Sequence, residues 1–438
     1  MSGKSPTEST SDRRLGTVSL TALVVASMVG AGVFTTSGFA LADLQDPAWV
    51  MAAWAVGGLI ATCGAYSYGQ LASRLTANGG EYLFLSRSVH PSAGFLAGWV
   101  SMLAGFTGAG AYAALAFETY VLSAMPGESG LPSGTIGVGL VLFATAAHAF
   151  HTQGGAWGQT AVVLVKLLLL GAFLAWSWVN AGRWSSMPEL MPAASVSWFA
   201  FATTVMWISL SYSGFNAAIY VAGEAAEGHA GVRRAMVGGT IAITVLYLLL
   251  NTVFLFGADS GAIAGQPTVA TIAAEAIGGP SMSMLVTIAI CIGLASSVSS
   301  IVMAGPRVYA KMAQDGLLPA ALHSPKSPPT FAVVLQGMAV AIVVWFSQLE
   351  SLLSYLGLSL SLSAAATAST LLLRSGSGDD AVPHWATRVP VVLYVVATLF
   401  ISALTLYHKP VQAIALVITV LSGLMLYLVV RTRARMTA

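Results

Sequence analysis

Long apolar stretches alternate with short polar segments along the chain. A helix that crosses a bilayer needs about 20 mostly apolar residues, and the pattern of hydrophobic and polar positions gives twelve such stretches. The connections between them leave no room for a soluble domain. We therefore predict twelve membrane-spanning helices, at residues 17–41, 48–73, 92–124, 134–151, 159–180, 197–223, 235–257, 281–312, 330–348, 351–373, 389–407 and 411–430.

Composition supports the membrane class. Of the 438 residues, 56% are hydrophobic and only 8% are charged, whereas a soluble domain carries about 25% charged residues. The net charge of +2 provides no strong field that would attract nucleic acid. Cys63 and Cys291 both lie in apolar stretches, which argues against a disulfide framework. We predict an all-α polytopic membrane protein that has the lipid bilayer as its environment and needs no metal or cofactor.

The polar segments at the two ends define the predicted domain limits. Residues 1–16 form a polar tail, 17–431 a single transmembrane domain, and 432–438 a second tail. Arg13 and Arg14 precede an apolar stretch and so superficially resemble a signal peptide. That stretch exceeds the 7–15 apolar residues of a signal core, and eleven more stretches follow it. We expect it to remain as the first helix.

Positively charged residues predict the orientation in a cell membrane, plasma or inner. Cytoplasmic loops of membrane proteins carry the excess of Lys and Arg. With a cytoplasmic N-terminus, the outer loops contain only Arg183 and Lys409. Both termini are then expected to be cytoplasmic. The inner loops and tails contain Lys4, Arg13, Arg14, Arg74, Arg87, Arg233, Arg234, Arg307, Lys311, Lys326, Arg374, Arg388, Arg431, Arg433 and Arg435.

Lys166 belongs to neither side of the membrane, because it lies within the fifth apolar stretch. An ionisable residue inside a bilayer is costly and marks a functional site by default. The alternative is snorkelling, in which the long side chain reaches the headgroups. Lys166 lies roughly 12 Å into the helix at 1.5 Å per residue, so the sequence alone leaves both interpretations open.

Glycines cluster in two of the predicted helices. Gly30 and Gly32 lie in the middle of the first, and Gly214 lies in the sixth among Ser211, Ser213 and Asn216. Such glycines serve either close helix packing or an unwound helix that lines a cavity. Broken helices at corresponding positions of two halves are typical of a transporter binding site. We expect breaks near Val29–Gly32 and Leu210–Phe215.

The two glycine clusters are five helices apart, and an odd offset inverts the topology of the second half. This arrangement predicts a five-plus-five inverted repeat. Repeat one would cover about 17–180 and repeat two about 197–373. The helices at about 389–430 would be added after the repeats.

Four motifs, in this order, resemble those of the amino acid–polyamine–organocation (APC) transporter family. They are GAGVF at 30–34, ANGGEYLFL at 77–85, SYSGFNAAIYVAGE at 211–224 and AGPRVYAKMAQDGLLP at 304–319. The resemblance implies a LeuT-like fold of twelve helices and the secondary transport of an amino acid by alternating access. The chain departs from the family pattern after Glu224, where the usual proline is missing, and before Gly79, where Thr76-Ala77-Asn78 replaces a segment with proline.

The same resemblance implies a substrate site that is built from main-chain groups. The substrate carboxylate would bind free N–H groups at Ala31 and Gly32, beside Gly30, where a helix begins and its dipole is positive. The ammonium would bind the carbonyls of Met28, Leu210 and Ser213. The full set of candidate binding residues is Met28, Gly30, Ala31, Gly32, Leu210, Ser213, Gly214 and Phe215.

Lys166 matches a lysine of sodium-independent family members. Its ammonium would replace the Na⁺ that bridges the first and eighth helices in sodium-coupled relatives. Ser296, in the segment SSVSS at 296–300, is the expected hydroxyl partner. The resemblance thus favours a coupling role for Lys166 over snorkelling.

The expected function is sodium-independent secondary transport of an amino acid, with proton coupling and exchange both left open. No acidic residue falls in the expected site, which favours a neutral substrate. The alternatives are a channel or receptor for a small amine, and a transporter of a polyamine or other organocation. We expect no enzyme and no catalytic residues, because the apolar stretches contain almost no acids or bases outside Lys166. The sequence does not indicate an oligomeric state.

Overall fold

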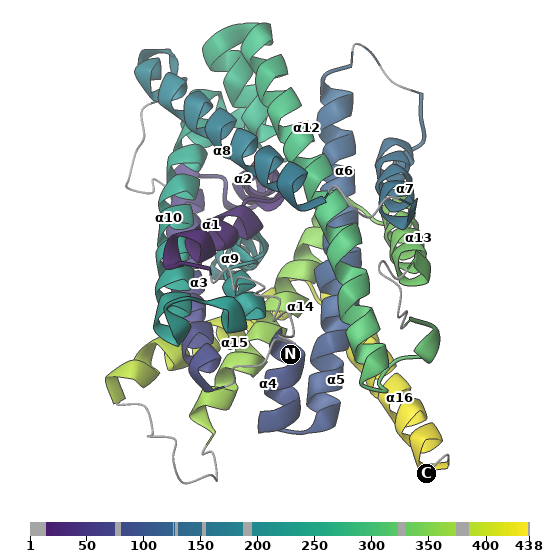
Figure 1. Cartoon of the computed structure of the whole chain (residues 1–438). Coiled ribbons are helices and arrows are strands. Elements are labelled where there is room, and N and C mark those ends of the chain that lie inside the picture. The colour runs from purple at the N-terminus through teal and green to yellow at the C-terminus, as the bar shows by residue number, and fades with distance from the viewer. Residues whose placement is uncertain are drawn as a thin grey trace, which may run out of the picture.

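The computed structural model describes residues 15–74, 80–125, 127, 130–150, 155–186, 195–322, 330–373 and 385–436. Within these ranges the chain is nearly all helical, and the only β-structure is an isolated bridge between Leu15 and Ala225. Helices are the expected form for apolar runs, since a helix satisfies its own backbone polar groups and needs no water for that purpose. Figure 1 shows the resulting bundle, in which the shorter helices α1, α2 and α9 lie among longer ones such as α3 and α10.

The first half of the chain contains α1 to α8. Two of its segments are interrupted: α1 and α2 are separated by three residues, and α5 and α6 are joined by a π-helical segment, η1. A short helix, α4, lies between α3 and α5. The bounds are α1 Thr17–Met28, α2 Gly32–Leu44, α3 Pro47–Arg74, α4 Gly80–Ser88, α5 Pro91–Val100, η1 Ser101–Gly108, α6 Ala109–Ser123, α7 Thr135–Phe150 and α8 Gly155–Val179.

The second half contains α9 to α16, with short 3₁₀ segments between several helices. A 3₁₀ turn, η2 (Ala181–Arg183), follows α8. The other bounds are α9 Trp198–Tyr212, η3 Ala217–Glu224, α10 Gly228–Gly257, α11 Ser260–Ile263, α12 Val269–Gln314, η4 Ala320–Leu322, α13 Thr330–Phe346, α14 Leu349–Ser369, η5 Thr370–Leu372, α15 Trp385–His408 and α16 Val411–Met436.

Length and composition identify a multi-pass membrane protein. In the described part, eight helices are long and apolar enough to cross a bilayer, and the bent pair α1–α2 makes a ninth. Two shorter apolar helices, Thr135–Ala149 and Thr330–Phe346, lie at the fourth and ninth predicted stretches. The sixth predicted stretch is α9 followed by η3. The predicted number of twelve crossings goes beyond this finding and stays a prediction.

The longest helix differs from its predicted bounds. Helix α12 has 46 residues and begins at Val269, whereas the predicted span covers 281–312. The chain bends at Gly279, whose φ of 73° is in the left-handed region, and Pro280 follows. The expected span corresponds to the part after this bend. The ten residues before it, 269–278, form a separate helical segment, because the backbone of Gly279 is not helical; glycine adopts its positive φ without strain.

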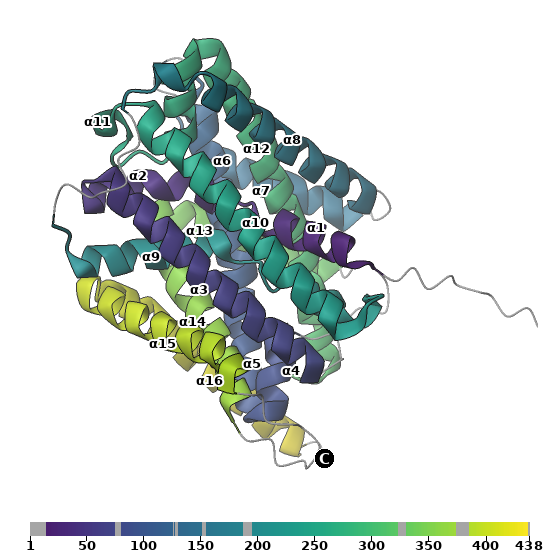
Figure 2. The same cartoon turned by 90° about the vertical axis from the view of Figure 1, so that its left-hand side faces the viewer.

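Helix packing places α9 at the centre of the bundle. Helix α10 packs along α3 and α1, and α9 contacts α2, α3, α14 and α15. At the periphery α7 pairs with α13, and α8 crosses α12 (Figures 1 and 2). The α1–α2 pair and α9 therefore pack against the long helices α10 and α3.

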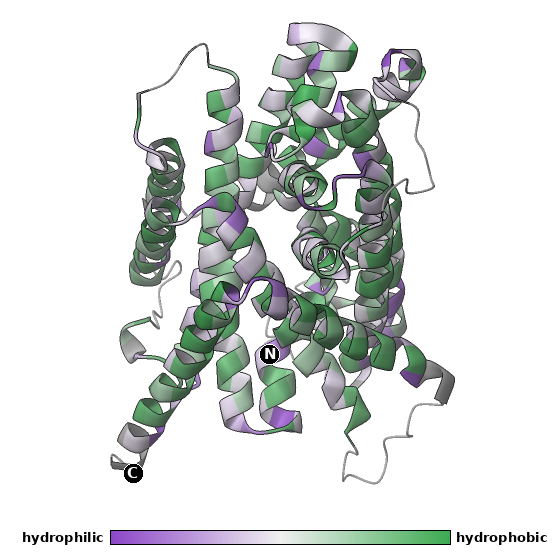
Figure 3. Cartoon of the chain, turned by 180° about the vertical axis from the view of Figure 1, so that it is seen from behind, coloured by the Kyte–Doolittle hydropathy of each residue, from purple (hydrophilic) through white to green (hydrophobic). Residues whose placement is uncertain are grey.

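The outer surface is apolar. Figure 3 shows hydrophobic residues along most of the helical ribbon, with hydrophilic ones gathered mainly at helix ends and connections. Large apolar side chains such as Val179, Phe346, Phe400 and Met425 are mostly exposed. In water such a surface would be unfavourable, whereas lipid tails are as apolar as these side chains.

An ionic cluster around Lys409 lies near the beginning of α3. The Lys409 ammonium lies 2.8 Å from a Glu350 carboxylate oxygen, 4.0 Å from Asp43 and 4.4 Å from the centre of the Trp207 ring. Asp43 precedes the first residue of α3 by four positions. The cluster thus connects the end of α2, the start of α14, the α15–α16 connection and α9.

Candidate functional site

The first helix is interrupted where the glycine pattern predicted. Helix α1 ends at Met28 because Val29 leaves the helical region, with ψ at 87°. Helix α2 begins at Gly32 and is bent by 46° relative to α1. Met28, Val29 and Ala31 are nearly completely buried. The predicted break near Val29–Gly32 is confirmed.

The second interruption lies within the predicted stretch, Leu210–Phe215. Helix α9 continues to Tyr212, and Gly214 then turns the chain with a φ of 107°. The segment resumes as the 3₁₀ helix η3. Leu210 therefore still belongs to α9, and its carbonyl accepts a hydrogen bond from the Ser213 N–H at 3.0 Å. The break begins at Ser213, whose ψ of 139° leaves the helical region, and Gly214 follows with its positive φ.

The two breaks touch each other through their glycines. A Cβ atom on Gly214 would lie 2.7 Å from the Ser27 carbonyl oxygen. A Cβ atom on Gly32 would overlap the Ser211 side chain and lie 3.0 Å from the Ser211 Cα. Any larger residue would push the backbones apart. These glycines let two interrupted helices meet main chain to main chain.

Lys166 is directed at the first break. Its side chain is 6% exposed, and its ammonium donates a hydrogen bond to the Val29 carbonyl at 2.5 Å. The stem packs on α12 at Gly293, where a Cβ would lie 2.7 Å from the lysine Cδ. A snorkelling lysine would instead be directed at the headgroups. The predicted contact with a carbonyl near Ser27–Val29 is confirmed.

Ser296 was the expected hydroxyl partner of the Lys166 ammonium. The hydrogen bond that the structure gives the ammonium goes to Val29, and Ser296 as a partner stays a prediction. Ser299, one turn further along α12, contacts a ring nitrogen of His148 at 2.8 Å. Ser299 of the SSVSS segment thus contacts α7 through His148.

Tyr247 is a site residue that the sequence reasoning missed. Its hydroxyl lies 2.7 Å from the Met28 carbonyl and 3.1 Å from the Ser211 carbonyl, so its single proton serves both breaks. Trp54 and Tyr212 pack edge-on or tilted against its ring. A buried tyrosine needs a hydrogen-bond acceptor for its hydroxyl. From the sequence, this requirement could have indicated that the Tyr247 hydroxyl has a buried acceptor, but not which residue provides it.

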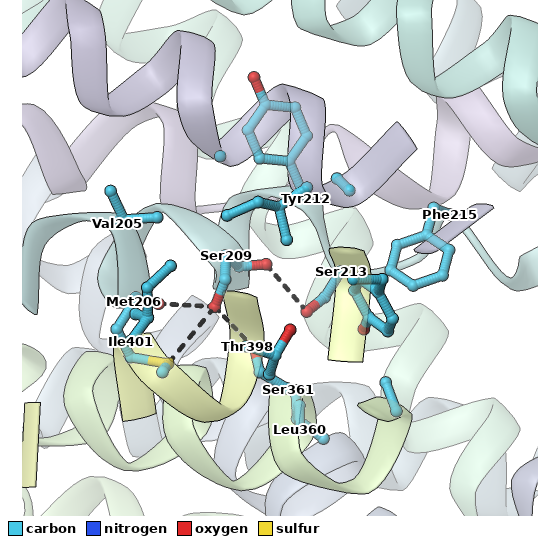
Figure 4. A pocket seen from close by; sticks show the side chains of 15 residues that line it. Val205, Met206, Ser209, Tyr212, Ser213, Phe215, Leu360, Ser361, Thr398 and Ile401 are labelled. Atoms are coloured by element: carbon cyan, nitrogen blue, oxygen red, sulfur yellow. Dashed lines mark hydrogen bonds between the residues drawn. The ribbon is translucent and has the colours of Figure 1, made fainter. Parts of the chain in front are cut away.

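A pocket borders the second break on the side away from α1 and α2. Its empty space of about 520 Å³ is partly open to the surroundings, and its walls come from α3, α9, α14 and α15 together with the residues that follow α9. Figure 4 shows Ser209, Ser213, Ser361 and Thr398 gathered at its floor. The Ser209 and Ser361 hydroxyls are 2.9 Å apart. The wall contains no Lys, Arg, Asp, Glu or His, so the pocket is uncharged. The residues that line it are Gly57, Ile60, Ala61, Val205, Met206, Ser209, Tyr212, Ser213, Phe215, Leu360, Ser361, Ala364, Tyr394, Thr398 and Ile401.

The predicted binding residues are divided between two places. Ser213 and Phe215 line the pocket. Met28, Gly30, Ala31 and Gly32 form the first break, next to Lys166 and Tyr247. Gly214 lies in the second break against the Ser27 carbonyl of α1, and Leu210 lies near the end of α9. The carbonyls of Met28 and Leu210, which were expected to bind a substrate ammonium, have protein donors in this conformation.

Phe215 separates the pocket from the α4 end of the bundle. Its ring packs edge-on against Tyr68 at 5.4 Å and against Tyr394 at 6.3 Å between ring centres. Gly64 leaves the space that these rings fill, since a Cβ there would lie 3.1 Å from Phe215. Three aromatic rings therefore close one side of the pocket.

The described residues contain no group of three or more His, Cys, Asp or Glu side chains that could hold a metal ion. What the site offers instead is free helix ends, carbonyls, hydroxyls and one ammonium. Such groups recognise a small polar molecule by hydrogen bonds.

Comparisons with known proteins agree with this arrangement. A family model described as amino acid permease matches residues 15–430. The serine/threonine exchanger SteT of Bacillus subtilis (strain 168) is 25% identical over 344 residues, which are 76% of each chain. The large neutral amino acids transporter small subunit 2 of Mus musculus is 22% identical over 91% of this chain and 77% of its own. The b(0,+)-type amino acid transporter 1 of the same species is 20% identical over 95% and 87%. The chain belongs to the amino acid permease family.

Proposed function

We propose that this permease carries a neutral amino acid across the membrane by alternating access, with the substrate bound between the two helix breaks. The observation that carries the proposal is the direct contact of the breaks at Gly32 and Gly214. Broken helices that meet in this way are the usual binding site of secondary transporters, because they expose main-chain groups where no water competes.

The chemistry of an amino acid fits the two sides of this contact. The N-terminus of α2, at Ala31 and Gly32, presents N–H groups and the positive end of a helix dipole to a carboxylate. The carbonyls of Met28, Leu210 and Ser213 are the proposed acceptors for the ammonium. A substrate ammonium would replace the Tyr247 hydroxyl as the donor to Met28. Gly30 keeps this space free of a side chain.

The substrate side chain is proposed to enter the uncharged pocket beside Ser213, Gly214 and Phe215. Its hydroxyl groups and apolar walls suit a small polar or aliphatic side chain. A charged side chain would lose its hydration and find no partner there. The names of the relatives, a serine/threonine exchanger and a large neutral amino acids transporter, support a neutral substrate and exchange as the mode of transport.

The proposed architecture is twelve crossings with a five-plus-five inverted repeat. The α1–α2 break and the α9–η3 break are taken as the equivalent positions of repeat one, about 17–180, and repeat two, about 197–373. The helices at about 389–430 follow the repeats, within a transmembrane domain of residues 17–431. Both termini are proposed to be cytoplasmic, which places α4 on the cytoplasmic side and Lys409 outside.

Lys166 is proposed to make transport independent of sodium. An ammonium on the Val29 carbonyl occupies the kind of position that a Na⁺ ion holds between helices. A lysine in such a place is compact and positively charged, and it can also exchange a proton. Proton coupling is therefore part of the proposal, with Ser296 as a second partner when the site rearranges.

The test is transport by the purified protein in proteoliposomes. A panel of radiolabelled amino acids would be offered to vesicles that contain the same unlabelled compound, with Na⁺ present or replaced by choline and with or without a pH gradient. We expect saturable counterflow of neutral amino acids that is unaffected by the removal of Na⁺. The absence of counterflow for every amino acid would refute the proposed function, and a strict need for Na⁺ would refute the role of Lys166.

A further inference from the structure

Glu81 joins three helices at the α4 end of the bundle. One of its carboxylate oxygens accepts a hydrogen bond from the Tyr68 hydroxyl of α3 at 2.6 Å. The other accepts one from the Ser363 hydroxyl of α14 at 2.8 Å. Glu81 itself lies in the first turn of α4. A single carboxyl group therefore connects α3, α4 and α14.

No positive charge in the described part of the chain compensates this carboxylate. The groups that face it are the hydroxyls of Tyr68 and Ser363 and the phenols of Tyr220 in η3 and Tyr394 in α15. Helix α5 and the 3₁₀ turn η5, which also pack on α4, contain no titratable residue. The ion pairs that the structure gives do not include Glu81.

Burial raises the pKa of the Glu81 carboxyl above its ordinary value, and the hydrogen bonds from Tyr68 and Ser363 act in the opposite direction. Glu81 lies outside the membrane-spanning helices, between α3 and α5. In this conformation the group thus binds a proton more readily than a glutamate in water does.

The contact reaches the wall of the substrate pocket through one ring. Tyr68, which donates to Glu81, packs edge-on against Phe215. Phe215 lines the pocket and follows Gly214 in the second break. Ala364, the neighbour of Ser363, lines the same pocket. To open the pocket toward α4, the Tyr68–Phe215 and Glu81–Ser363 contacts must both separate.

We propose that Glu81 binds a proton and that this proton stabilises the closed conformation of the α4 end of the pocket. We call this proton-dependent contact of Glu81 with Tyr68 and Ser363 the latch. The proposal rests on the proposed transport function, since a latch matters only where the pocket opens and closes.

The direction of the pH effect follows from the raised pKa. When the α4 end opens, water reaches Glu81 and its pKa returns toward the ordinary value. Protonation therefore favours the closed conformation. This stabilisation is complete below the ordinary pKa of glutamate and is lost as the pH rises through the raised pKa. A single site of this kind changes the ratio of closed to open molecules by at most about tenfold per pH unit.

The decisive measurement is the accessibility of the pocket from the α4 side. Ala364→Cys is introduced after Cys63→Ala and Cys291→Ala have removed the native thiols. The full-length protein is labelled in vesicles with a membrane-impermeant thiol reagent applied at the α4 side over a range of pH. Because thiol reactivity itself varies with pH, every rate is divided by that of the same protein with Glu81→Gln. We expect this ratio to rise severalfold as the pH increases.

Three further variants separate a proton latch from a structural role. Glu81→Gln imitates the neutral carboxyl, so its own opening should be low and should not titrate. Ser363→Ala removes a donor that lowers the pKa, and the midpoint should move to higher pH. Glu227→Gln, a change at a partly exposed glutamate that pairs with Arg234, should keep the profile of the unchanged protein.

A flat ratio, or an unmoved midpoint in Ser363→Ala, would overturn the latch. The labelling needs no substrate, so it still reports on Glu81 if no amino acid is transported. Failure of the proposed function would appear only in the counterflow assay.

Discussion

The two helix breaks differ in what surrounds them. The first, between α1 and α2, is packed on both sides: Lys166 holds the Val29 carbonyl and Tyr247 holds the Met28 carbonyl. The second, after α9, borders a pocket of about 520 Å³. Its Phe215 ring reaches across to Tyr68 and Tyr394.

This difference suggests that the two breaks have different roles in the proposed binding site. The first break is held by donors from α8 and α10, so its shape depends on a cation and a phenol far away in the sequence. The second has room beside it and is free to adapt to a substrate and to move. Four predictions challenge or sharpen this contrast.

The largest effect is expected from Gly32→Val. Its Cβ would overlap Ser211 and force the two breaks apart. Overpacking of this kind costs about 1–3 kcal/mol, and at the upper end a binding constant falls by about 100-fold. Every amino acid should lose affinity alike in an equilibrium binding assay, while the protein still inserts and folds.

Gly171→Val is the matched control for Gly32→Val. A Cβ at Gly171 in α8 would meet nothing within 4 Å, so binding should be unchanged. If Gly32→Val lost only bulky amino acids, Gly32 would line a side-chain pocket and the contact between the breaks would not be the binding site.

The next largest effect is expected at Lys166. Lys166→Ala leaves the Val29 carbonyl without its donor, and uptake and its pH response should both fall sharply, by about 10-fold or more, because a hydrogen bond to a charged group is worth about 1.5–3 kcal/mol. Lys166→Arg keeps the charge but replaces a compact ammonium with a planar fork. It should fold and yet transport poorly.

A snorkelling lysine would behave in the opposite way, because arginine snorkels as well as lysine does. Near-normal uptake with an unchanged pH profile in both variants would make Lys166 a membrane anchor. The first break would then be held by Tyr247 alone.

Tyr247→Phe should have a moderate effect. It removes the one hydroxyl that is shared by the Met28 and Ser211 carbonyls. A typical hydrogen bond contributes about 1 kcal/mol, so the rate of counterflow should change by about fivefold. Tyr355→Phe, which removes a hydroxyl contact with Thr419 between α14 and α16, is the control. Equal effects of both changes would show that Tyr247 acts by packing only.

The smallest effect is expected in the pocket. Ser361→Ala removes the partner of the Ser209 hydroxyl. Uptake of hydroxylated amino acids should fall by about twofold relative to aliphatic ones, because one neutral hydrogen bond near water is worth about 0.5 kcal/mol. Competition between two labelled substrates measures this ratio. Ser123→Ala changes a serine whose hydroxyl donates to the Tyr120 carbonyl of its own helix, α6, and should leave the ratio unchanged.

The two breaks also show what the sequence was able to predict. Gly30, Gly32 and Gly214 identified the breaks, because a helix in lipid rarely contains such clusters without a reason. Lys166 was identified by its charge alone. The exact start of the second break was not predicted, since Ser211 and Tyr212 are compatible with a helix and α9 ends only where the backbone of Ser213 leaves the helical region.

The remaining features depend on contacts between distant segments. Tyr247 looks like any apolar position of its helix until the fold brings it to Met28. Ser361 and Thr398 join Ser209 only because α14 and α15 pack on α9. Glu81 sits in a motif that was recognised, yet its donors are 13 residues before it and 282 residues after it. No local pattern in the sequence encodes such separations.

The Lys409 cluster has a consequence for how the protein responds to its medium. It lies near the start of α3, whereas Glu81 lies just after the end of that helix, about 42 Å away at 1.5 Å per residue. Lys409 is held by opposite charges at the partly exposed residue Glu350 and at Asp43, and dissolved ions screen such attractions over about 3 Å at 1 M salt. The Glu81 contacts involve only neutral donors and are indifferent to screening. A higher ionic strength should therefore weaken the Lys409 contacts at one end of the bundle and leave the Glu81 contacts at the other end unchanged. The stability of the two ends should then depend differently on the salt concentration of the solution that each end faces.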